Sequence, residues 1–314
     1  MKPHLTIRIA ICLTVMVGFL VNPLWMPAAE AINYFFYIEQ GGVDTGDCNS
    51  SDPCGSIGYV VDYINNTVIP GAGDVVEIHV DFGTYPTPNL TWDVNYTLFI
   101  IGITPALTIL DGGNSHPTLD INLTATGVFI LYNVTVQNGS GQFGLPGGGL
   151  RLVGTGSNSV FIEDSVFSNN HAPGGGGGMH LSSVTANLRD VTISDNTSTS
   201  GGGAGFSVFG ANISYHDGEV ARNSISHIDF AAGAGMYIIA SDLEMLRVYV
   251  HDNEINAPDA SGAGMYLSGD MTSVLIANSV VSQNVIRADG DDALGAGIYC
   301  RADISTNFTM LNTT

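Results

Sequence analysis

The residues of this 314-residue chain that are best suited to chemistry are carboxylates, and the densest group is an acidic run near its C-terminal end. Asp289, Asp291 and Asp292 lie in the sequence Asp-Gly-Asp-Asp. Calcium prefers oxygen ligands of this kind, so these three aspartates are candidate calcium ligands. The rest of an EF-hand loop is missing, and a solvated acidic turn is the alternative interpretation. The sequence indicates no other cofactor.

Two kinds of carbohydrate catalysis need residues that the chain carries only in part. A lyase needs a base that removes a proton, and a glycosidase needs paired carboxylates facing one groove. Lysine does not occur after residue 31, and Arg189 and Arg247 lie seven and six residues before a recurrent asparagine, where they would share an outer face. The carboxylates on or near predicted strands are Glu163, Asp164, Asp190 and Asp217. Outward strand residues are polar in any case, so the pattern favours a non-catalytic chain.

The elements that would position these residues recur at nearly constant spacing. Glycine-rich runs end on an apolar residue, a second apolar residue follows two positions later, and successive runs lie 27 to 33 residues apart. The two apolar positions are occupied by Leu150, Met179, Phe206, Met236, Met265 and Ile298, and by Leu152, Leu181, Val208, Ile238, Leu267 and Cys300. Such periods indicate a repeat architecture, and alternation with period two indicates strands. Residues 74–314 are therefore predicted to form an all-β solenoid, a parallel β-helix.

An asparagine recurs in the same pattern and is predicted to form a ladder. Its positions are Asn170, Asn196, Asn223, Asn253 and Asn284, each preceded three residues earlier by a large apolar residue, with Gly139 in the equivalent place one repeat before. Identical amide side chains in stacked strands can bond to one another along the axis. Asparagine and glycine both tolerate the left-handed backbone, which is expected at this position. The segments 224–235, 254–264 and 285–297 are longer than the equivalent earlier segments and are predicted to be surface loops stacked on one side.

Residues 32–73 differ from the repeats and are predicted to form an N-terminal cap over the open end of the solenoid. Residues 33–39 are predicted to form a strand. Ser56 is a candidate N-cap of a short helix, because the apolar residues that follow it would lie on one face. They are Ile57, Val60, Val61 and Ile64.

The cysteines after residue 31 are predicted to play structural roles. In an exported chain, Cys48 and Cys54 are expected to close a short disulfide loop, and a metal pair is the alternative. No histidine or further cysteine lies nearby to complete a metal site. Cys300 is in register with Leu267 and is predicted to be a small buried apolar residue.

Residues 1–31 are interpreted as a secretory signal peptide. Lys2 and Arg8 form a basic start, residues 9–21 are an apolar run, and Ala29-Glu30-Ala31 is a candidate cleavage site. The run is shorter than the ~20 residues a membrane-spanning helix needs, which disfavours an anchor. The rest of the chain has six arginines and 28 carboxylates. This balance disfavours nucleic acid and anionic membranes as partners.

Several of these motifs resemble known repeats. Gly-Gly-Gly-Leu at 147–150 and Gly-Gly-Gly-Met at 176–179 resemble the GGA[ILV] element of polymorphic outer-membrane-protein repeats, and Phe167-Ser-Asn-Asn170 resembles their FxxN element. The cysteine loop and the Leu110-Asp111-Gly112 turn are similar to the N-terminal part of secreted proteins with the pectate-lyase-like fold. This resemblance implies a right-handed parallel β-helix. It implies little about activity, because this fold carries adhesins, lyases, hydrolases and structural proteins.

These observations predict a secreted or cell-surface repeat protein that is non-catalytic and adhesin-like, with outer-membrane association left open. A polysaccharide lyase or glycoside hydrolase is the alternative. The expected partner is an extracellular polysaccharide or a host or cell-surface ligand, and no membrane insertion is expected after signal cleavage. Asn312 occupies the place of Asn278 one repeat later, and the next recurrent asparagine would fall beyond Thr314. The solenoid is therefore expected to be truncated at its C-terminal end.

Overall fold

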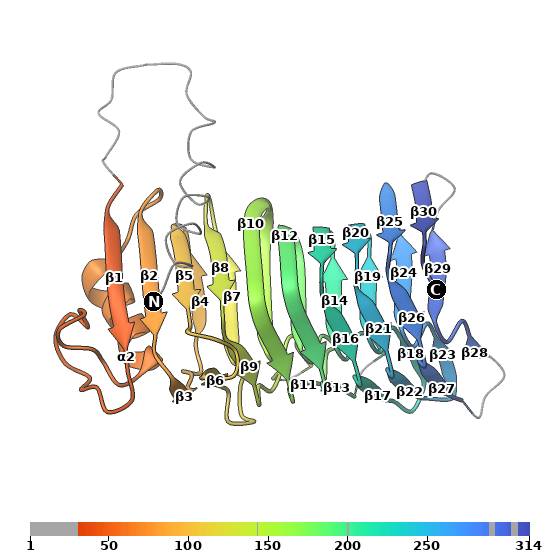
Figure 1. Ribbon diagram of the computed structural model, residues 1–314, viewed down its shortest axis with the longest axis horizontal. Helices are drawn as coiled ribbons and strands as arrows, with labels where there is room; N and C mark the ends of the chain where they lie inside the picture. The colour runs from red at the N-terminus through yellow and green to blue at the C-terminus, as the bar shows by residue number, and fades with distance from the viewer. Residues whose placement is uncertain (1–30, 143, 200, 289–292, 303–306) are drawn as a thin grey trace, which may run out of the picture. The chain divides into compact units, whose positions relative to one another are not determined.

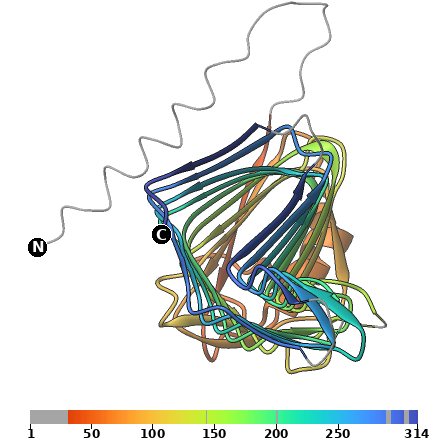
Figure 2. The same cartoon turned by 90° about the vertical axis from the view of Figure 1, so that its right-hand side faces the viewer.

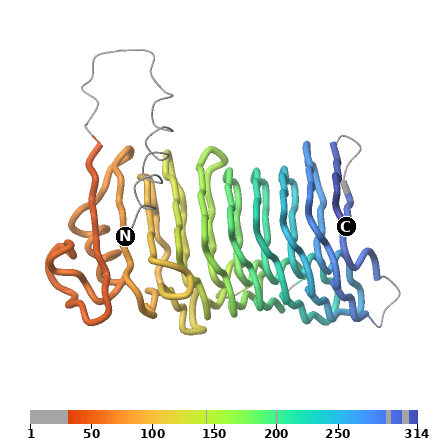
Figure 3. Tube along the Cα trace, viewed as in Figure 1, coloured from red at the N-terminus to blue at the C-terminus, as the bar shows by residue number. Residues whose placement is uncertain are grey.

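The computed structural model describes residues 31–314 except 143, 200, 289–292 and 303–306. The predicted signal peptide lies outside this part apart from Ala31, and it stays a prediction. From Ile32 onward the strands of successive coils stack in parallel, as Figures 1, 2 and 3 show. The predicted all-β parallel β-helix is therefore confirmed.

Each coil contributes strands at equivalent places, which form columns along the axis. The first column contains β4 (Thr91–Val94), β7 (Leu119–Leu123), β14 (Phe206–Phe209), β19 (Met236–Ile239), β24 (Met265–Gly269) and β29 (Ile298–Ala302). The second column contains β1 (Asn33–Ile38), β2 (Val75–Val80), β5 (Thr97–Ile101), β8 (Val128–Tyr132), β15 (Asn212–His216), β20 (Asp242–Leu246), β25 (Ser273–Ala277) and β30 (Asn307–Leu311). The third column contains β3 (Gly83–Pro86), β6 (Thr108–Asp111), β9 (Thr135–Gln137), β16 (Glu219–Ala221), β21 (Tyr249–His251) and β26 (Val280–Ser282). Two long strands, β10 (Leu150–Ser168) and β12 (Met179–Ser194), belong to all three columns.

The segments that follow the third column contain further short strands. One set is β11 (His171–Ala172), β13 (Thr197–Ser198), β17 (Ser224–Ser226), β22 (Glu254–Asn256) and β27 (Val285–Arg287), and the other is β18 (Phe230–Ala232), β23 (Asp259–Ser261) and β28 (Ala293–Leu294). They pair in parallel, so the predicted stacking of the longer segments is confirmed. Their description as plain surface loops is wrong. Ile225 and Ile255 are buried in a small second core made mostly of alanines, where small side chains let the segments pack closely.

Alternation along each strand separates the core from the surface. In β15, Ile213 and Tyr215 point inward and are buried, while Asn212, Ser214 and His216 point outward. The predicted apolar pairs after the glycine runs are buried from Leu150 and Leu152 to Met265 and Leu267. Cys300 is in register with Leu267 but is exposed, so its predicted burial is wrong. It lies on the last coil, where no described strand stacks on its other side.

The recurrent asparagines are joined by hydrogen bonds along one corner of the solenoid. Nδ2 of Asn196 donates to the carbonyl oxygen of Phe167 and to Oδ1 of Asn223, both at 3.0 Å. Oδ1 of Asn196 accepts the main-chain N–H and the side-chain Nδ2 of Asn170. The pattern repeats through Asn253 to Asn284. The carbonyls of the apolar residues three positions before Asn170, Asn196, Asn223 and Asn253 therefore belong to the ladder.

The expected left-handed backbone lies one residue earlier than predicted. The residues with positive φ at this corner are Asn138, Asn169, Asp195, Arg222, Asp252 and Gln283. None of the ladder asparagines has positive φ, because the chain turns just before them and leaves the amide pointing along the axis. Gly139 is explained by crowding, since a Cβ there would collide with the carbonyl oxygen of Gly148.

The N-terminal segment contains the predicted strand, disulfide and helix. Cys48 and Cys54 are bonded, with Cα atoms 5.0 Å apart, so the metal-pair alternative is wrong. The helix α2 (Ile57–Tyr63) begins after Ser56, whose hydroxyl accepts the N–H of Tyr59, and it continues into the π-helical turn η2 (Ile64–Val68). The predicted apolar residues of this helix are buried in the main core of the solenoid.

Candidate functional site

The outward side chains of the first column form a line along the solenoid, which we call the Arg151 column. Its members, in register from coil to coil, are Thr91, Asp120, Arg151, His180, Ser207, Tyr237, Tyr266 and Tyr299. Glycine turns run beside this line and leave room for it. A Cβ on Gly147 would lie 2.7 Å from Arg151, and a Cβ on Gly176 would lie 2.6 Å from Oγ of Ser207. The absence of a Cβ at the repeated glycines therefore leaves space for the outward side chains as well as for the stacked turns.

A pocket of about 250 Å³ lies at the Arg151 end of this column. It is lined by the first-column residues Thr91, Asp120 and Arg151, together with Gln142 and Leu145. The other residues that line it are Asn89, Leu90 and Pro117. The pocket thus combines one ion pair with neutral hydrogen-bonding groups and apolar surface.

Arg151 is held by only one edge of its guanidinium. Nη1 donates to Oδ1 of Asp120 at 2.8 Å, and Oδ2 of Asp120 accepts the hydroxyl of Thr91 at 2.8 Å. Nε of Arg151 is buried and has no hydrogen-bond partner among the described residues. An unsatisfied buried donor costs roughly 1–3 kcal/mol, so an acceptor is expected at this edge.

Other arginines of the chain use the same edge in a different way. Arg222 places Nε and Nη2 on the two carboxylate oxygens of Asp195, and Arg247 does the same with Asp217. Nε of Arg287 donates to Glu254 at 2.6 Å. These contacts join neighbouring coils at the surface. Compared with them, the unfilled Nε of Arg151 is the exception.

His180 follows Arg151 in the column and is kept neutral. Its side chain is buried, and Nδ1 lies 2.7 Å from Oγ of Ser207. Burial first, and the charge of Arg151 second, lower the pKa of His180 to about 4. Near pH 7 the imidazole therefore adds no charge, and its low basicity makes it a poor general base.

The tyrosines of the column stack on one another. The rings of Tyr237 and Tyr266 are 5.2 Å apart at 15°, and those of Tyr266 and Tyr299 are 5.3 Å apart at 18°. Because the ring faces contact each other, they are not open to a ligand. Burial raises the pKa of Tyr237, with the nearby Tyr266 as a second cause. The stack joins coils and is not a candidate site.

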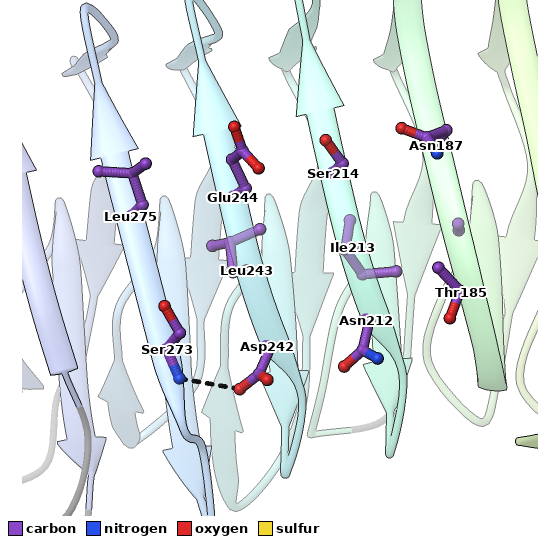
Figure 4. Close-up of a pocket in the computed structure, with 11 residues that line it drawn as sticks. Thr185, Asn187, Asn212, Ile213, Ser214, Asp242, Leu243, Glu244, Ser273 and Leu275 are labelled. Carbon is purple, nitrogen blue, oxygen red and sulfur yellow. Dashed lines mark hydrogen bonds between the residues drawn. The ribbon is translucent and has the colours of Figure 1, made fainter.

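A shallow depression of about 340 Å³ lies on the outer face of the second column, as Figure 4 shows. Nε2 of His216 lies 3.0 Å from Oγ of Ser214 and 3.5 Å from Oε1 of Glu244. A catalytic relay needs the two partners on opposite ring nitrogens, so this group is not a triad. Burial opposes ionisation of Asp242, but hydrogen bonds from Thr272 and Ser273 lower its pKa, which makes it a structural carboxylate.

The residues weighed for carbohydrate catalysis do not form an active-site pair. Arg247 binds Asp217 and, through that hydrogen bond first, lowers the pKa of Asp217. Nε of Arg189 lies 3.6 Å from Asp190 at the same corner, and its charge also acts on Asp217. Glu163 and Asp164 lie on and beside this corner one coil earlier, where Glu163 is in register with Arg189. The arginines thus neutralise carboxylates of the corner.

A buried histidine joins two coils at the third column. Nε2 of His251 lies 2.8 Å from Oε1 of Glu219, and Nδ1 lies 2.7 Å from Oδ2 of Asp252. The ring stacks on Tyr249 with centroids 3.7 Å apart. Both nitrogens and one face are occupied by the protein, so we interpret His251 as a structural link.

The sequence pattern did not single out the Arg151 pocket. Arg151 and His180 each follow the first apolar residue of a glycine run, so strand alternation alone could have placed them on one outward line. The unfilled Nε could not have been found in this way.

Metal binding at the acidic run is not addressed by the described residues. Asp289, Asp291 and Asp292 lie outside them, and the calcium site stays a prediction. Among the residues that are described, no cluster of three or more His, Cys, Asp or Glu could hold a metal ion. In the same part of the chain, no helix combines the length and apolar character needed to cross a membrane.

A match to a family model supports the architecture. Residues 120–314, more than half of the chain, match the family model described as a right handed beta helix region. No curated protein matches the chain. Among solved structures, the pectin methylesterase from Aspergillus niger, in its deglycosylated form, is 15% identical, with 91% of this chain and 90% of that chain covered and a TM-score of 0.31. The predicted right-handed β-helix is confirmed, while the finer resemblance to polymorphic repeats stays a prediction.

Proposed function

The chain belongs to the right-handed β-helix family, and we propose that it binds a carboxylate-bearing saccharide outside the cell, in the pocket at Arg151. The observation that carries this proposal is the buried, unpartnered Nε of Arg151. A guanidinium edge binds a carboxylate through two parallel hydrogen bonds. Asn89, Thr91 and Gln142 add neutral donors and acceptors of the kind that bind sugar hydroxyls.

Net charge limits the kind of saccharide. The chain carries a formal charge of −21, so a long polyanion is repelled by the whole surface. A single carboxylate in the pocket interacts mainly with Arg151 and Asp120, because more distant charges are screened beyond about 8 Å at physiological ionic strength. We therefore propose a ligand with sparse carboxylates, or the end of an acidic chain.

An extracellular location fits the disulfide, since such bonds persist in oxidising compartments. Association with a cell surface or outer membrane, and an adhesin-like role, would follow if the saccharide is displayed on cells. Binding to whole cells that is lost on addition of free uronic acid would support this form of the proposal.

Calorimetric titration with glucuronate and galacturonate oligosaccharides tests the binding proposal. We expect Arg151→Ala to weaken binding by about tenfold to a hundredfold, as for loss of a charged hydrogen bond. Arg151→Lys should not restore it, because lysine keeps the charge without the flat edge. Arg189→Ala is the control, since Arg189 lies on an exposed corner. Uronate binding that is absent in the wild-type protein, or unchanged in Arg151→Ala, contradicts the proposal.

A polysaccharide lyase or glycoside hydrolase is the second candidate. It is favoured by one feature of the same pocket. If the guanidinium of Arg151 binds the carboxylate of a uronate, it makes the C–H group next to that carboxylate more acidic. His180 is a poor base for that proton, which is why we place binding first. Incubation with polyuronides, with and without calcium, would decide between them. Unsaturated or new reducing-end products that disappear in Arg151→Ala would establish catalysis.

A further inference from the structure

Three phenylalanines lie in one line on the outer face of the second column. The register places Phe35 beside Glu77, Glu77 beside Phe99, Phe99 beside Ile130, and Ile130 beside Phe161. A phenylalanine therefore occurs on every second strand, from β1 through β5 to β10. Figure 1 shows these strands side by side at the N-terminal half of the solenoid. We call Phe35, Phe99 and Phe161 the phenylalanine line.

The spacing of the line follows from the strands. Neighbouring strands lie roughly 4.8 Å apart, so rings on every second strand repeat at about 9 to 10 Å. Phe35 and Phe161 are 47% and 38% exposed, and Phe99 is half-buried. No ring in the line stacks on another in the line, in contrast to the tyrosines of the Arg151 column. Phe35 stacks on His79 instead, and the three rings recur along an almost straight track.

The surroundings of the line are apolar with two carboxylates, and Nε2 of His79 lies 3.2 Å from Oε2 of Glu77. Ile130 fills the place between Phe99 and Phe161, and Ile101 and Tyr132 lie in the next outward row. Glu77 and Glu163 are the acidic residues of these rows. A protein partner would have to bury these carboxylates, which is costly without a matching cation. A second copy of this acidic chain would also be repelled.

We propose that the phenylalanine line binds a neutral, extended β-1,4-linked polysaccharide that lies along the solenoid axis. The faces of such sugars carry C–H groups with slight positive charge, and these pack on the negative faces of aromatic rings. In a two-fold chain, alternate sugars present the same face, with a repeat close to the ring spacing. Glu77 and Glu163 would accept hydrogen bonds from the hydroxyls. Arg189, which is in register with Glu163 on the next coil, lies 3.6 Å from Asp190, so its charge is already balanced and gives an anionic polymer little attraction.

This surface is separate from the Arg151 pocket. The pocket belongs to the first column, whereas the phenylalanine line belongs to the second. The inference does not rest on the proposed function, and Arg151→Ala should bind a neutral polymer as the wild-type protein does. Failure of uronate binding would therefore leave this inference intact, and the reverse also holds.

Sedimentation with microcrystalline cellulose and with chitin tests the inference. We expect the wild-type protein to bind at least one of them, and Phe99→Ala and Phe161→Ala each to weaken binding about tenfold, as for loss of half of a buried aromatic side chain. Phe230→Ala is the matched control, because Phe230 is 44% exposed on β18, outside the second column. Amylose, whose linkage coils the chain, and polygalacturonate should not be retained. Melting curves verify that each variant is folded.

A double variant distinguishes the effect of ring spacing from non-specific binding by exposed aromatic side chains. Asn187→Phe in the Phe161→Ala background keeps the number of rings but moves one of them to the neighbouring strand β12, at an exposed position in register with residue 161. We expect it to bind no better than Phe161→Ala. Recovery of wild-type binding would overturn the spacing argument. Absence of binding to both β-1,4-linked polymers, or equal binding by the phenylalanine variants and the control, would overturn the proposal as a whole.

Discussion

Arg151 and His180 occupy equivalent positions on β10 and β12, so a guanidinium and an imidazole are neighbours in one line of stacked side chains. Ser207 continues the line and lies 2.7 Å from Nδ1 of the histidine. The arrangement concentrates one positive charge at Arg151 and leaves His180 neutral. Stacking in register therefore tunes side-chain chemistry as well as packing.

Stability should depend on pH through His180. Its folded pKa is about 4, against an ordinary value of 6.5, so between these values the unfolded chain binds a proton that the folded chain does not. Stability must then fall as the pH is lowered from 6.5 to 4. We expect this residue to contribute a loss of about 3 kcal/mol, since one pKa unit corresponds to about 1.4 kcal/mol. Urea unfolding at several pH values would measure it.

His180→Gln is the variant for this measurement, because it removes the titrating group and keeps a polar side chain. The remaining titratable groups are the same in the wild-type protein and the variant. The difference between their curves of stability against pH therefore isolates the contribution of His180. His227→Gln, in the segment between β17 and β18, controls for the loss of a histidine. An unchanged slope in His180→Gln between pH 4 and 6.5 would refute the assignment.

The asparagine ladder should be strongly stabilising. Asn196→Ala leaves the main-chain N–H of Asn170 and the carbonyl of Phe167 without this partner in the interior, whereas Oδ1 of Asn223 keeps the main-chain N–H of residue 196. Each unsatisfied buried group costs roughly 1–3 kcal/mol, so we expect a loss of about 3 kcal/mol or more. Asn187→Ala, at an exposed outward position of β12, should change stability by less than about 0.5 kcal/mol. Coincident denaturation curves for the two variants would exclude a stabilising ladder.

The columns were predictable because stacked coils select the same residue type at the same place. The apolar pairs such as Leu150 and Leu152 therefore revealed the core, and the asparagines revealed the ladder. The left-handed residue was misplaced because asparagine suits both roles, and only the hydrogen bonds distinguish them. Asp195 takes the left-handed turn, while Asn196 supplies the amide.

The pocket and the phenylalanine line were not predictable from repeats alone. Both depend on outward residues, which are not constrained to match their copies on neighbouring coils. Phe99 and Phe161 become neighbours on a track only once the register of β5, β8 and β10 is known. The prediction for Cys300 failed for a different reason. Its position in the repeat was predicted correctly, but its predicted burial was wrong.

Close contact beside the Arg151 column should make one glycine irreplaceable. Gly203 has φ of +64°, and a Cβ there would lie 2.9 Å from the carbonyl oxygen of Phe206 and from Cβ of Ser207. Gly210 has a similar φ of +57°, but a Cβ would meet only Oγ of Ser183 at 4.0 Å. Both alanine variants carry the left-handed penalty of about 1–2 kcal/mol. We expect Gly203→Ala to unfold at a clearly lower temperature, and Gly203→Val to be worse. Equal melting temperatures for the two alanine variants would contradict this steric account.

The disulfide should stabilise the N-terminal segment locally. Cys48 and Cys54 close a short loop that precedes α2, and Asp44 in the preceding turn accepts hydrogen bonds from Gly55 and Ser56. Chain entropy for a loop of this size predicts a contribution of about 2 kcal/mol. We expect the Cys48→Ser, Cys54→Ser double variant to lose this amount, with faster amide exchange in α2 than in β12. Cys300→Ser is the control for loss of a thiol, because Cys300 is exposed and unpaired among the described residues. If the double variant and this control unfold alike, the loop is held by Asp44 and by packing of α2, and the disulfide adds little.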